Sequence, residues 1–449
     1  MRESGSIRIA IPSKAEYIIN TIIDAGYEAY VVGGCVRDSI LGKVPGDWDI
    51  TTSATPNQVK ALFPRTIDTG IQHGTVTVMM DKEGFEVTTY RIDGKYEDSR
   101  HPKEVTFTPC LEEDLRRRDF TINAMAYNER NGLVDIFGGM EDIDRGIIRC
   151  VGNAEERFGE DALRIMRAIR FSAQLGYRIE DNTKTAIKKL APTLRAISAE
   201  RIRVELEKLL CSPHPDYIRD AYEMGITKVI LPEFDVCMET PQKHPHHQYN
   251  VGEHILHTLN HVKADRVLRL AMFFHDIGKP GMLSVDEEGI HHFYNHPEES
   301  ERITRSILRR LRYDNDTIAK VCQLVYYHDY CNGVVPNERL VRRALHRVGE
   351  EMFPYLFPVM RADVLGQSDY MRQEKLDNID LWESVYEKVK AAGQCVSLKT
   401  LAVTGKDLMA MGIPEGPKLG QTLNELLELV LEHPEWNEKE RLLEELQKR

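Results

Sequence analysis

A glycine turn and a pair of carboxylates lie close together near the start of the chain. A short apolar run ends in Gly33 and Gly34, and Arg37 follows. Asp47 and Asp49 flank a tryptophan ten residues further on. Glycines after a buried strand permit the backbone angles and close approach that a triphosphate requires, and an arginine adds a planar fork of donors. Residues two apart on a strand share a face, so the aspartates would hold a divalent cation such as Mg²⁺.

Either feature alone would favour an ordinary glycine turn and a solvated acidic loop. Their combination resembles the nucleotidyltransferase superfamily of DNA polymerase beta, and more closely the class II tRNA nucleotidyltransferases, which include CCA-adding enzymes and bacterial poly(A) polymerases. The resemblance implies a head with a mixed sheet and helices. It also implies that Asp47 and Asp49 bind Mg²⁺, while Gly33, Gly34 and Arg37 bind a nucleotide.

Two later segments extend the resemblance. Segment 86–91 is expected to be a strand, on which Glu86 is either a third metal-site carboxylate or an exposed strand glutamate. Segment 93–102 is polar and rich in turn formers. It resembles the mobile loop that these enzymes use when they change nucleotide, and its presence argues for an enzyme able to add adenosine.

Segment 115–126 is expected to place an arginine and an aspartate at the start of an apolar helix. The matching family motif handles the ribose and the triphosphate, which makes Arg118 a nucleotide ligand. Asp119 and Asn123 are further candidates for the same role. The alternative is an ordinary helix start in which Asp119 serves as a cap.

A second motif begins at Glu160 and is expected to lie on one helix. Residues three apart are neighbours on a helix, so Asp161 and Arg164 would project into one cavity, with Arg167 and Arg170 along the same surface. Cytosine and adenine both place an amino donor beside a ring-nitrogen acceptor. A carboxylate and a guanidinium would therefore accept C and A and reject U and G. This matches the base-selecting motif of the family, although an amphipathic helix with internal salt bridges would share the pattern.

A third constellation lies in the helical second half and is not required for nucleotide transfer. His254 is expected to open one helix, His275 and Asp276 to end another, and Asp363 to lie on a later one. The order resembles the HD phosphohydrolase superfamily, which binds a divalent transition metal through these four ligands. His296 and His328 stand where some members bind a second metal. The remaining histidines of the segment are expected to be non-ligands: His244, His246, His247, His257, His261, His291 and His292.

Composition sets the general class. The chain has 449 residues, of which 42% are hydrophobic and 29% charged, which is typical of several globular domains. The eight cysteines include no C-x-x-C pair, so reduced thiols are expected. No apolar run has the length of a signal peptide or a membrane span. We therefore expect a cytoplasmic protein without a membrane partner.

The net charge of −12 is unfavourable for binding nucleic acid, because phosphate contacts normally depend on lysine and arginine. A local basic surface must then supply them. One candidate segment carries ten cations: Arg164, Arg167, Arg170, Arg178, Lys184, Lys188, Lys189, Arg195, Arg201 and Arg203. The glycines and lysines of the last segment, 401–420, are further candidates for contacts to RNA backbone.

The expected fold class is α+β, with a polymerase-beta-like nucleotidyltransferase head followed by all-α parts. The expected divisions are the head at 1–150, a neck at 151–211, a body at 212–370 with the HD region at about 245–365, and a tail at 371–449. The expected function is template-independent, Mg²⁺-dependent addition of CCA from CTP and ATP to the 3′ end of tRNA, with no obligate protein partner. Three alternatives stay open: addition of A alone to tRNA ending in CC, poly(A) synthesis, and an HD phosphohydrolase whose head only senses nucleotide.

Overall fold

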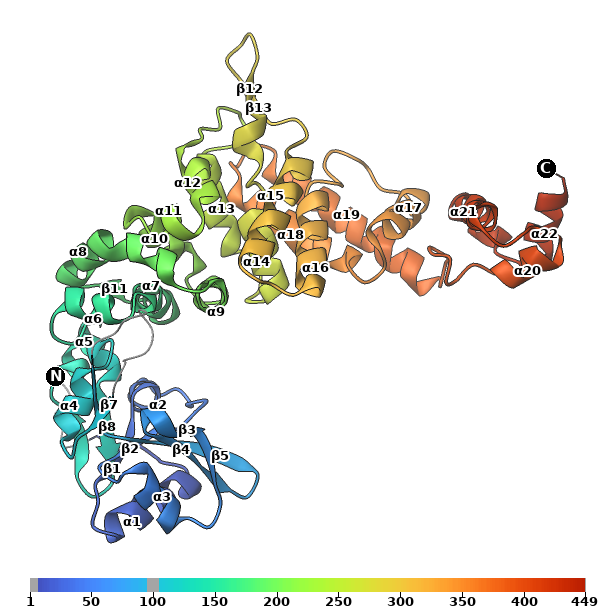
Figure 1. Cartoon of the computed structure of the whole chain (residues 1–449). Coiled ribbons are helices and arrows are strands. Elements are labelled where there is room, and N and C mark those ends of the chain that lie inside the picture. The colour runs from blue at the N-terminus through green and yellow to red at the C-terminus, as the bar shows by residue number, and fades with distance from the viewer. Residues whose placement is uncertain (1–6, 95–104, 449) are drawn as a thin grey trace. The chain divides into compact units, whose positions relative to one another are not determined.

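The computed structural model describes residues 7–94 and 105–448, so most of the predicted nucleotide-switching loop at 93–102 lies outside the described residues. The chain divides into two compact units, Met1–Pro232 and Glu233–Arg449 (Figure 1). Each unit has its own core, and each is described by itself below. No helix among the described residues is long and apolar enough to cross a membrane.

A seven-stranded sheet forms the base of the first unit, in the order β3-β4-β5-β2-β1-β8-β9. The strands are β1 (Ala29–Val32), β2 (Ile50–Thr52), β3 (Thr66–Gly70), β4 (Thr75–Met80), β5 (Glu83–Thr89), β8 (Met125–Asn128) and β9 (Gly132–Asp135). Strands β2 and β5 pair in parallel and all other neighbours pair antiparallel. The sheet is therefore mixed, as expected for the head. Strands β6 (Arg91–Asp93) and β7 (Val105–Phe107) follow β5 in the sequence and form a separate antiparallel pair.

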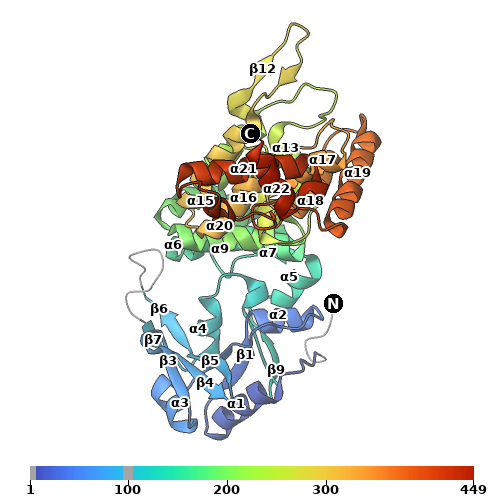
Figure 2. The same cartoon turned by 90° about the vertical axis from the view of Figure 1, so that its right-hand side faces the viewer.

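Helices α1 (Ser13–Asp24) and α3 (Pro56–Leu62) lie side by side against this sheet (Figure 1, Figure 2). Helix α1 buries Ala15, Ile18, Ile19 and Ile22. This is the spacing of one helical face, which removes a continuous apolar stripe from water. The short helix α2 (Gly34–Ile40) follows β1 directly, so the glycine turn lies at the end of a central strand.

The helix expected across 115–126 is wrong. Helix α4 ends at Arg116 (Leu111–Arg116), a 3₁₀ turn covers Thr121–Asn123, and β8 follows. All four residues of β8 are buried, and the strand pairs with β1 on one side and β9 on the other. A short, fully apolar run suits a central strand as well as a buried helix, and the available sheet partners decide the outcome.

Helices build the rest of the first unit. They are α5 (Gly139–Arg145), α6 (Ala154–Glu160), α7 (Leu163–Leu175), α8 (Asp181–Leu190), α9 (Ala199–Leu210), α10 (Ile218–Glu223) and α11 (Thr227–Ile230). Helices α7 and α9 pack together. The second motif was expected on one helix, but α6 ends at Glu160 and Asp161 lies in the break before α7. The side chain of Asp161 accepts a hydrogen bond from the N–H of Leu163, which stabilises the break.

The second unit is helical. Its helices are α12 (Pro232–Glu239), α13 (Val251–Leu259), α14 (Arg266–Phe274), α15 (His296–Arg310), α16 (Asn315–Tyr327), α17 (Glu338–Val348), α18 (Phe353–Gly366), α19 (Arg372–Ala391), α20 (Gly405–Ala410), α21 (Pro417–Glu432) and α22 (Lys439–Gln447). Helix α14 buries seven of its nine residues and packs against α13, α16 and α18. This central helix therefore fixes whatever side chains stand at its end.

Two short strand pairs depart from the all-α expectation for the parts after the head. Strands β10 (Ile147–Ile148) and β11 (Arg178–Ile179) pair in parallel, which ties the segment after α7 back to the end of the head. Strands β12 (Ser284–Val285) and β13 (His291–His292) form a small hairpin in the second unit. Pairs of two residues are too short to be recognised from sequence alternation.

Candidate functional site

The register of the sheet brings the three candidate carboxylates of the head to one face. Strands β2 and β5 pair in parallel with Ile50 opposite Val87, and both of these side chains are buried. The preceding residues, Asp49 and Glu86, therefore point to the opposite, exposed face at the same level. Asp47 stands two residues before Asp49 in the extended approach to β2.

The charges of these carboxylates act on one another. Desolvation raises the pKa of Glu86, and Asp49 and Asp47 raise it further. Desolvation also raises the pKa of Asp49, where the charge of Arg118 opposes the effect and that of Asp47 adds to it. Mutual repulsion of this kind is relieved by a divalent cation, and oxygen ligands are those that Mg²⁺ prefers. The donor set of this face thus fits a metal ion.

Gly33 places the backbone of the turn directly beneath Arg118. Its φ of 82° and ψ of −128° are accessible to glycine and strained for other residues. A Cβ built on Gly33 would lie 3.1 Å from Nη1 of Arg118. The other end of that guanidinium is held by the buried Asp114, whose Oδ2 lies 3.4 Å from Nη2. Asp114 is a positioning residue that the motifs did not indicate, although its spacing of four from Arg118 was visible in the sequence.

A buried polar chain connects the turn to α7. Arg37 donates from Nη1 to the Oδ1 of Asn123 at 2.6 Å, and Asn123 donates from Nδ2 to Asp119 at 3.3 Å. Arg167 donates from Nε to the other oxygen of Asp119 at 2.7 Å. Burial opposes ionisation of Asp119, but Arg167 and Arg164 hold its pKa below the ordinary value. Both oxygens of Asp119 are thus used by protein groups, and the network fixes Arg37 and Arg167 relative to each other.

Phe171 lies among the arginines of this region. The guanidinium carbons of Arg37, Arg167 and Arg170 stand 5.0, 5.3 and 3.8 Å from the centre of its ring. Arg170 is buried and donates from Nε to Glu205 of α9 at 2.5 Å. A ring that faces several cations reduces the cost of gathering them. Phe171 therefore helps to stabilise the three arginines. The sequence did not indicate this role, because Phe171 follows the pattern of an ordinary core residue.

The two base-selecting candidates have separate partners. Oδ2 of Asp161 accepts from Nη2 of Arg201 at 2.7 Å. Arg164 donates from Nη1 to Glu160 at 2.5 Å and from Nη2 to the carbonyl of Arg117 at 2.9 Å. Each side chain is fixed, but each keeps hydrogen-bonding capacity: a carboxylate has about four acceptor positions and a guanidinium five N–H donors.

Five of the ten cations in the candidate RNA-binding segment form ion pairs. These pairs are Arg164–Glu160, Arg167–Asp119, Arg170–Glu205, Lys189–Glu155 and Arg201–Asp161. Arg178, Lys188 and Arg195 are exposed, and no carboxylate among the described residues pairs with them. The surface available to a phosphate backbone is therefore smaller than the sequence suggested.

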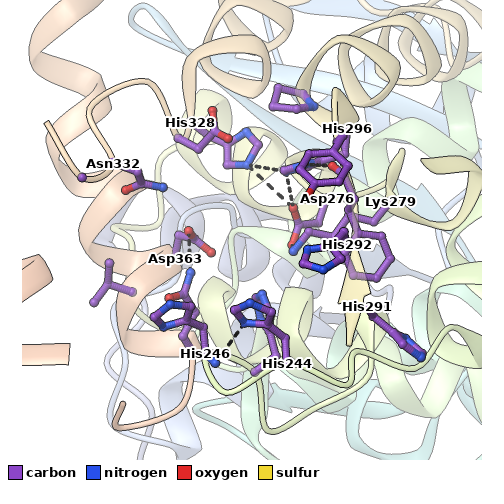
Figure 3. A pocket seen from close by; sticks show the side chains of 18 of the residues that line it. His244, His246, Asp276, Lys279, His291, His292, His296, His328, Asn332 and Asp363 are labelled. Atoms are coloured by element: carbon purple, nitrogen blue, oxygen red, sulfur yellow. Dashed lines mark hydrogen bonds and ion pairs between the residues drawn. The ribbon is translucent and has the colours of Figure 1, made fainter. Parts of the chain in front are cut away.

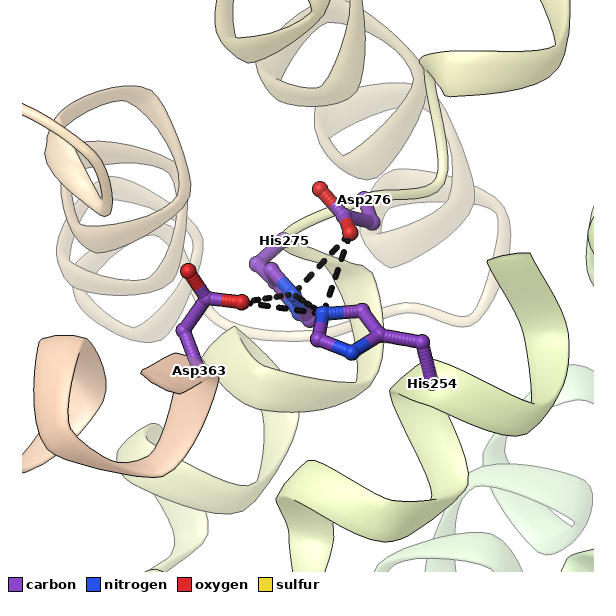
Figure 4. Close-up of side chains that lie close together, drawn as sticks. All are labelled: His254, His275, Asp276 and Asp363. Carbon is purple, nitrogen blue, oxygen red and sulfur yellow. Dashed lines mark hydrogen bonds and ion pairs between the residues drawn. The ribbon is translucent and has the colours of Figure 1, made fainter. Parts of the chain in front are cut away.

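The four residues of the HD pattern meet in the second unit (Figure 4). Nε2 of His254 on α13 lies 2.9 Å from Oδ1 of Asp363 on α18, and 3.3 Å from Oδ2 of Asp276. Nε2 of His275 lies 3.2 Å from Nε2 of His254 and 3.3 Å from the same Asp276 oxygen. Adjacent ligands of an ion with bonds of about 2.1 Å are separated by roughly 3 Å, so these four atoms match one coordination shell.

The surroundings prepare these four residues for a cation. Nδ1 of His254 faces the carbonyl of Gly366 at 3.1 Å and Nδ1 of His275 that of Met272 at 2.7 Å. When each Nδ1–H donates to its carbonyl, both Nε2 atoms present a lone pair toward the centre, as a metal ligand requires. Burial opposes ionisation of Asp276, but His275 and Lys279 hold its pKa well below the ordinary value. Neither buried oxygen of Asp276 accepts a well-aligned hydrogen bond from the described residues. The donor set therefore fits a divalent transition metal.

His296 and His328 form a second group with the outer oxygen of Asp276. Their Nε2 atoms lie 3.3 and 3.7 Å from Oδ1 of Asp276 and 3.2 Å from each other. Each Nδ1 faces a backbone carbonyl, that of Phe293 at 2.8 Å and that of Val325 at 2.7 Å. One oxygen of Asp276 thus faces each of the two groups of potential ligands.

A pocket of about 630 Å³ opens over both groups (Figure 3). Five histidines that were expected to be non-ligands line or approach it outside the two groups: His244, His246, His247, His291 and His292. Lys279 lies 2.7 Å from Asp276, and Lys375 donates to Gln367, which in turn donates to Asp363. The pocket therefore offers two ammonium groups beside the buried carboxylates, a combination suited to a phosphate ester.

The fold and the geometry of the head define a nucleotidyltransferase. Residues 29–149 match the family model described as the poly A polymerase head domain. Residues 176–238 match the probable RNA and SrmB-binding site of polymerase A, and residues 285–446 match a tRNA nucleotidyltransferase domain 2. These models do not name an HD domain, so the metal-site hypothesis for the second unit rests on its side chains.

Individual relatives narrow the class. The CCA-adding enzyme of Lactobacillus helveticus is 37% identical over 93% of this chain and 92% of its own length. That of Leuconostoc mesenteroides is 57% identical over 196 residues, a match that spans about half of its length. The Bacillus stearothermophilus CCA-adding enzyme in complex with CTP superimposes with a TM-score of 0.70 at 32% identity, covering 97% of both chains. The chain therefore belongs to the family of CCA-adding enzymes, the tRNA nucleotidyltransferases that add CCA to the 3′ end of tRNA.

Proposed function

We propose that the first unit performs the complete CCA addition, taking CTP and ATP, with Asp47 and Asp49 as the ligands of Mg²⁺. The observation that carries the assignment is the register of β2 and β5, which aligns Asp49 with Glu86 on one exposed face. When bound, Mg²⁺ supplies charge stabilisation for attack of the terminal 3′-hydroxyl on the α-phosphate and for the leaving pyrophosphate. The relatives are bacterial enzymes, so the proposal includes a location in the cytoplasm.

The glycine turn and its arginines would bind the triphosphate. Gly33 and Gly34 let the phosphates approach the backbone, since neither residue has a side chain of its own. Arg118 lies over Gly33 and is fixed by Asp114, and Arg37 is fixed by Asn123. Arginines that are already held in place lose little conformational freedom on binding, which favours a well-ordered nucleotide.

Asp161 and Arg164 would select the base. Asp161 retains acceptor capacity for the amino group of cytosine or adenine, and Arg164 retains donors for the ring nitrogen. Uracil and guanine would place a carbonyl against the carboxylate and lose that hydrogen bond. Arg167 and Arg170, held by Asp119 and Glu205, would support the same surface rather than read the base.

Transfer assays test this proposal directly. The purified chain would be incubated with Mg²⁺, labelled CTP or ATP, and tRNA transcripts that end before CCA or after CC. We expect ordered addition of C, C and A to the first transcript. Addition of A to the CC-ended transcript alone would indicate an A-adding enzyme, and long A tracts a poly(A) polymerase. Asp161→Ala should relax the choice between bases, and unchanged selection would refute its assigned role.

We also propose a metal-dependent phosphohydrolase activity in the second unit, because four buried ligands converge there within one coordination shell. His254, His275, Asp276 and Asp363 would hold the ion, and His296 and His328 a second one shared through Asp276. Such an ion activates water and polarises a phosphate oxygen. Lys279 and Lys375 would orient the phosphate within the pocket.

This second activity can be separated from the first by paired variants. Phosphate release from ribose 5-phosphate and adenosine monophosphates would be measured with Mn²⁺, Co²⁺, Ni²⁺ or Zn²⁺. We expect Asp363→Asn to abolish hydrolysis and retain nucleotide transfer, and Asp49→Asn to do the reverse. Metal binding without hydrolysis of any phosphate ester would leave a structural metal site and refute the hydrolase.

A further inference from the structure

Asp114 of α4 contacts more groups than its support of Arg118 requires. Its side chain has no exposed surface, and each carboxylate oxygen has partners of its own. Oδ2 accepts a hydrogen bond from Oγ1 of Thr51 at 3.1 Å and lies 3.4 Å from Nη2 of Arg118. Oδ1 accepts from Nε of Arg117 at 2.9 Å and lies 2.8 Å from Nη2 of the same guanidinium. One buried carboxylate therefore fixes two consecutive arginines.

These two arginines lead to different ends of the nucleotide site. Arg118 lies over Gly33, where the triphosphate would bind. The carbonyl oxygen of Arg117 accepts a hydrogen bond from Nη2 of Arg164, one of the two base-selecting candidates, at 2.9 Å. The main chain of Arg117 thus helps to orient the guanidinium of Arg164. Because Asp114 holds the side chain of Arg117 by two of its nitrogens, the position of this carbonyl depends on the same carboxylate.

The third partner of Asp114 belongs to the strand that follows the proposed metal ligands. Thr51 stands two residues after Asp49, and alternate residues of an extended chain share a face. Thr51 has no exposed surface and is paired with Thr88 of β5, so its hydroxyl occupies a fixed place in the sheet. Asp114 therefore connects both arginines to the strand beside the metal site.

The charges at this carboxylate make the arrangement rigid. Burial opposes ionisation of Asp114, but the guanidinium groups of Arg117 and Arg118 hold its pKa below the ordinary value. Removing one partner of a buried ion pair leaves an uncompensated charge, which is strongly unfavourable. The three side chains are therefore stable only together.

We infer that Asp114 couples selection of the base to binding of the triphosphate. The inference rests on the roles proposed above for Arg118 and Arg164, and it adds Asp114 and Arg117 as positioning residues that act through them. With Asp114 in place, the two guanidinium groups that contact the nucleotide stand at a fixed separation. A nucleotide bound to both must present the correct base edge and the correct α-phosphate position at once.

Initial rates with CTP and with UTP, on a tRNA transcript that ends before CCA, test the coupling. Asp114→Asn keeps the size of the side chain and removes its charge. We expect kcat/KM for CTP to fall roughly tenfold, and the preference for CTP over UTP to fall by a similar factor. Arg117→Ala should lower the preference and leave KM for CTP close to the wild-type value, whereas Arg118→Ala should raise KM and keep the preference. The double variant Asp114→Asn/Arg117→Ala should discriminate no worse than Asp114→Asn alone.

Asp142→Asn is the matched control. Asp142 is also a buried carboxylate on a short helix of the first unit, and it too has a threonine and an arginine as partners, Thr121 at 2.6 Å and Arg149 at 3.1 Å. None of its described hydrogen bonds involves Arg118 or Arg164. We expect this variant to lower the free energy of unfolding in urea and to keep the preference for CTP over UTP. An equally relaxed preference in both variants would indicate a general loosening of the fold and overturn the inference.

Two further variants make every outcome decisive. If Asp114→Asn folds and keeps the wild-type preference, the inference is refuted. If it does not fold, Arg117→Ala decides, since the pair of Asp114 with Arg118 remains, and an unchanged preference would again refute the coupling. Arg164→Ala separates this result from the proposed function. An unchanged preference in Arg164→Ala would refute the base-selecting role together with the coupling, whereas a relaxed preference there but not in Asp114→Asn would refute the coupling alone.

Discussion

Gly33→Ala offers a sharp test of how the triphosphate site is built. The substitution has two effects: alanine must adopt a φ of 82°, and its methyl group would stand 3.1 Å from Nη1 of Arg118. The backbone strain costs about 1–3 kcal/mol of folding free energy. The contact is shorter than an optimal separation of roughly 3.5–4 Å, so the guanidinium must move by a few tenths of an ångström.

Movement of Arg118 should be visible in the kinetics. A hydrogen bond to a charged group contributes about 1.5–3 kcal/mol, and each 1.36 kcal/mol corresponds to roughly tenfold in rate. We therefore expect kcat/KM for both CTP and ATP to fall by about ten- to a hundredfold in Gly33→Ala. The two nucleotides should be affected equally, because the phosphates are common to both.

The matched control is Gly26→Ala. Gly26 also has a positive φ, 89°, but no atom within 4 Å of a Cβ built on it. The Gly26→Ala variant should show a similar decrease in the free energy of unfolding in urea, and its rate of nucleotide transfer should be unchanged. The double variant Gly33→Ala/Arg118→Ala should be no slower than Arg118→Ala alone if the methyl group acts through the arginine. A loss in Gly33→Ala no larger than in Gly26→Ala, or full additivity in the double variant, would refute the reasoning.

Three further outcomes are expected. Asp49→Asn should abolish nucleotide incorporation and leave the free energy of unfolding in urea unchanged within about 0.5 kcal/mol, because the side chain is exposed; an active variant would remove Asp49 from the metal site. Asp119→Asn should cost about 3–5 kcal/mol of stability at pH 7, since it breaks the buried pair with Arg167. The folded pKa of Asp119 lies below the ordinary carboxyl value, so this difference should persist above about pH 4 and disappear as the pH falls through the folded pKa; a difference independent of pH would contradict the ion pair. A hundredfold excess of Mn²⁺ over its dissociation constant should stabilise the second unit by about 2.7 kcal/mol in the wild type and not in Asp363→Asn, measured by thermal unfolding.

Residue spacing could predict which side chains lie close together because several constraints act within one element. The alternation around Ile50 and Val87 follows from strand geometry, so the common face of Asp49 and Glu86 needed only the correct pairing of two strands. The order of His254, His275, Asp276 and Asp363 likewise predicted the grouping seen in the second unit. The sequence did not predict the carboxylates that hold the arginines in place. Asp114 pairs with Arg118 and Glu205 with Arg170, and these contacts depend on how the chain packs.

The break before α7 illustrates a different limit. Good helix-forming residues surround Asp161 in the sequence, and the helical spacing of apolar residues continues through Phe171. The chain nevertheless leaves the helix at Asp161, whose side chain accepts from the N–H of Leu163 and from Arg201 of α9. Local propensity favours continuation by a fraction of a kcal/mol per residue, whereas these two hydrogen bonds involve a charged group and contribute more. Arg201, which lies forty residues away in the sequence, therefore favours the break over a continuous helix. A local sequence pattern contains no information about this contact.

Ion pairing within the neck also changes how the net charge of −12 should be understood. Counting cations in the sequence suggested ten candidates for RNA contact, but half of them neutralise carboxylates of the same unit. A paired arginine releases no counterion when a phosphate approaches, so it contributes little to the salt-dependent part of the affinity. Within this segment, contacts to the RNA backbone would then depend on the exposed cations without a described partner, such as Arg178, Lys188 and Arg195. This segment should therefore contribute fewer counterions to the salt dependence of tRNA binding than its ten cations suggest.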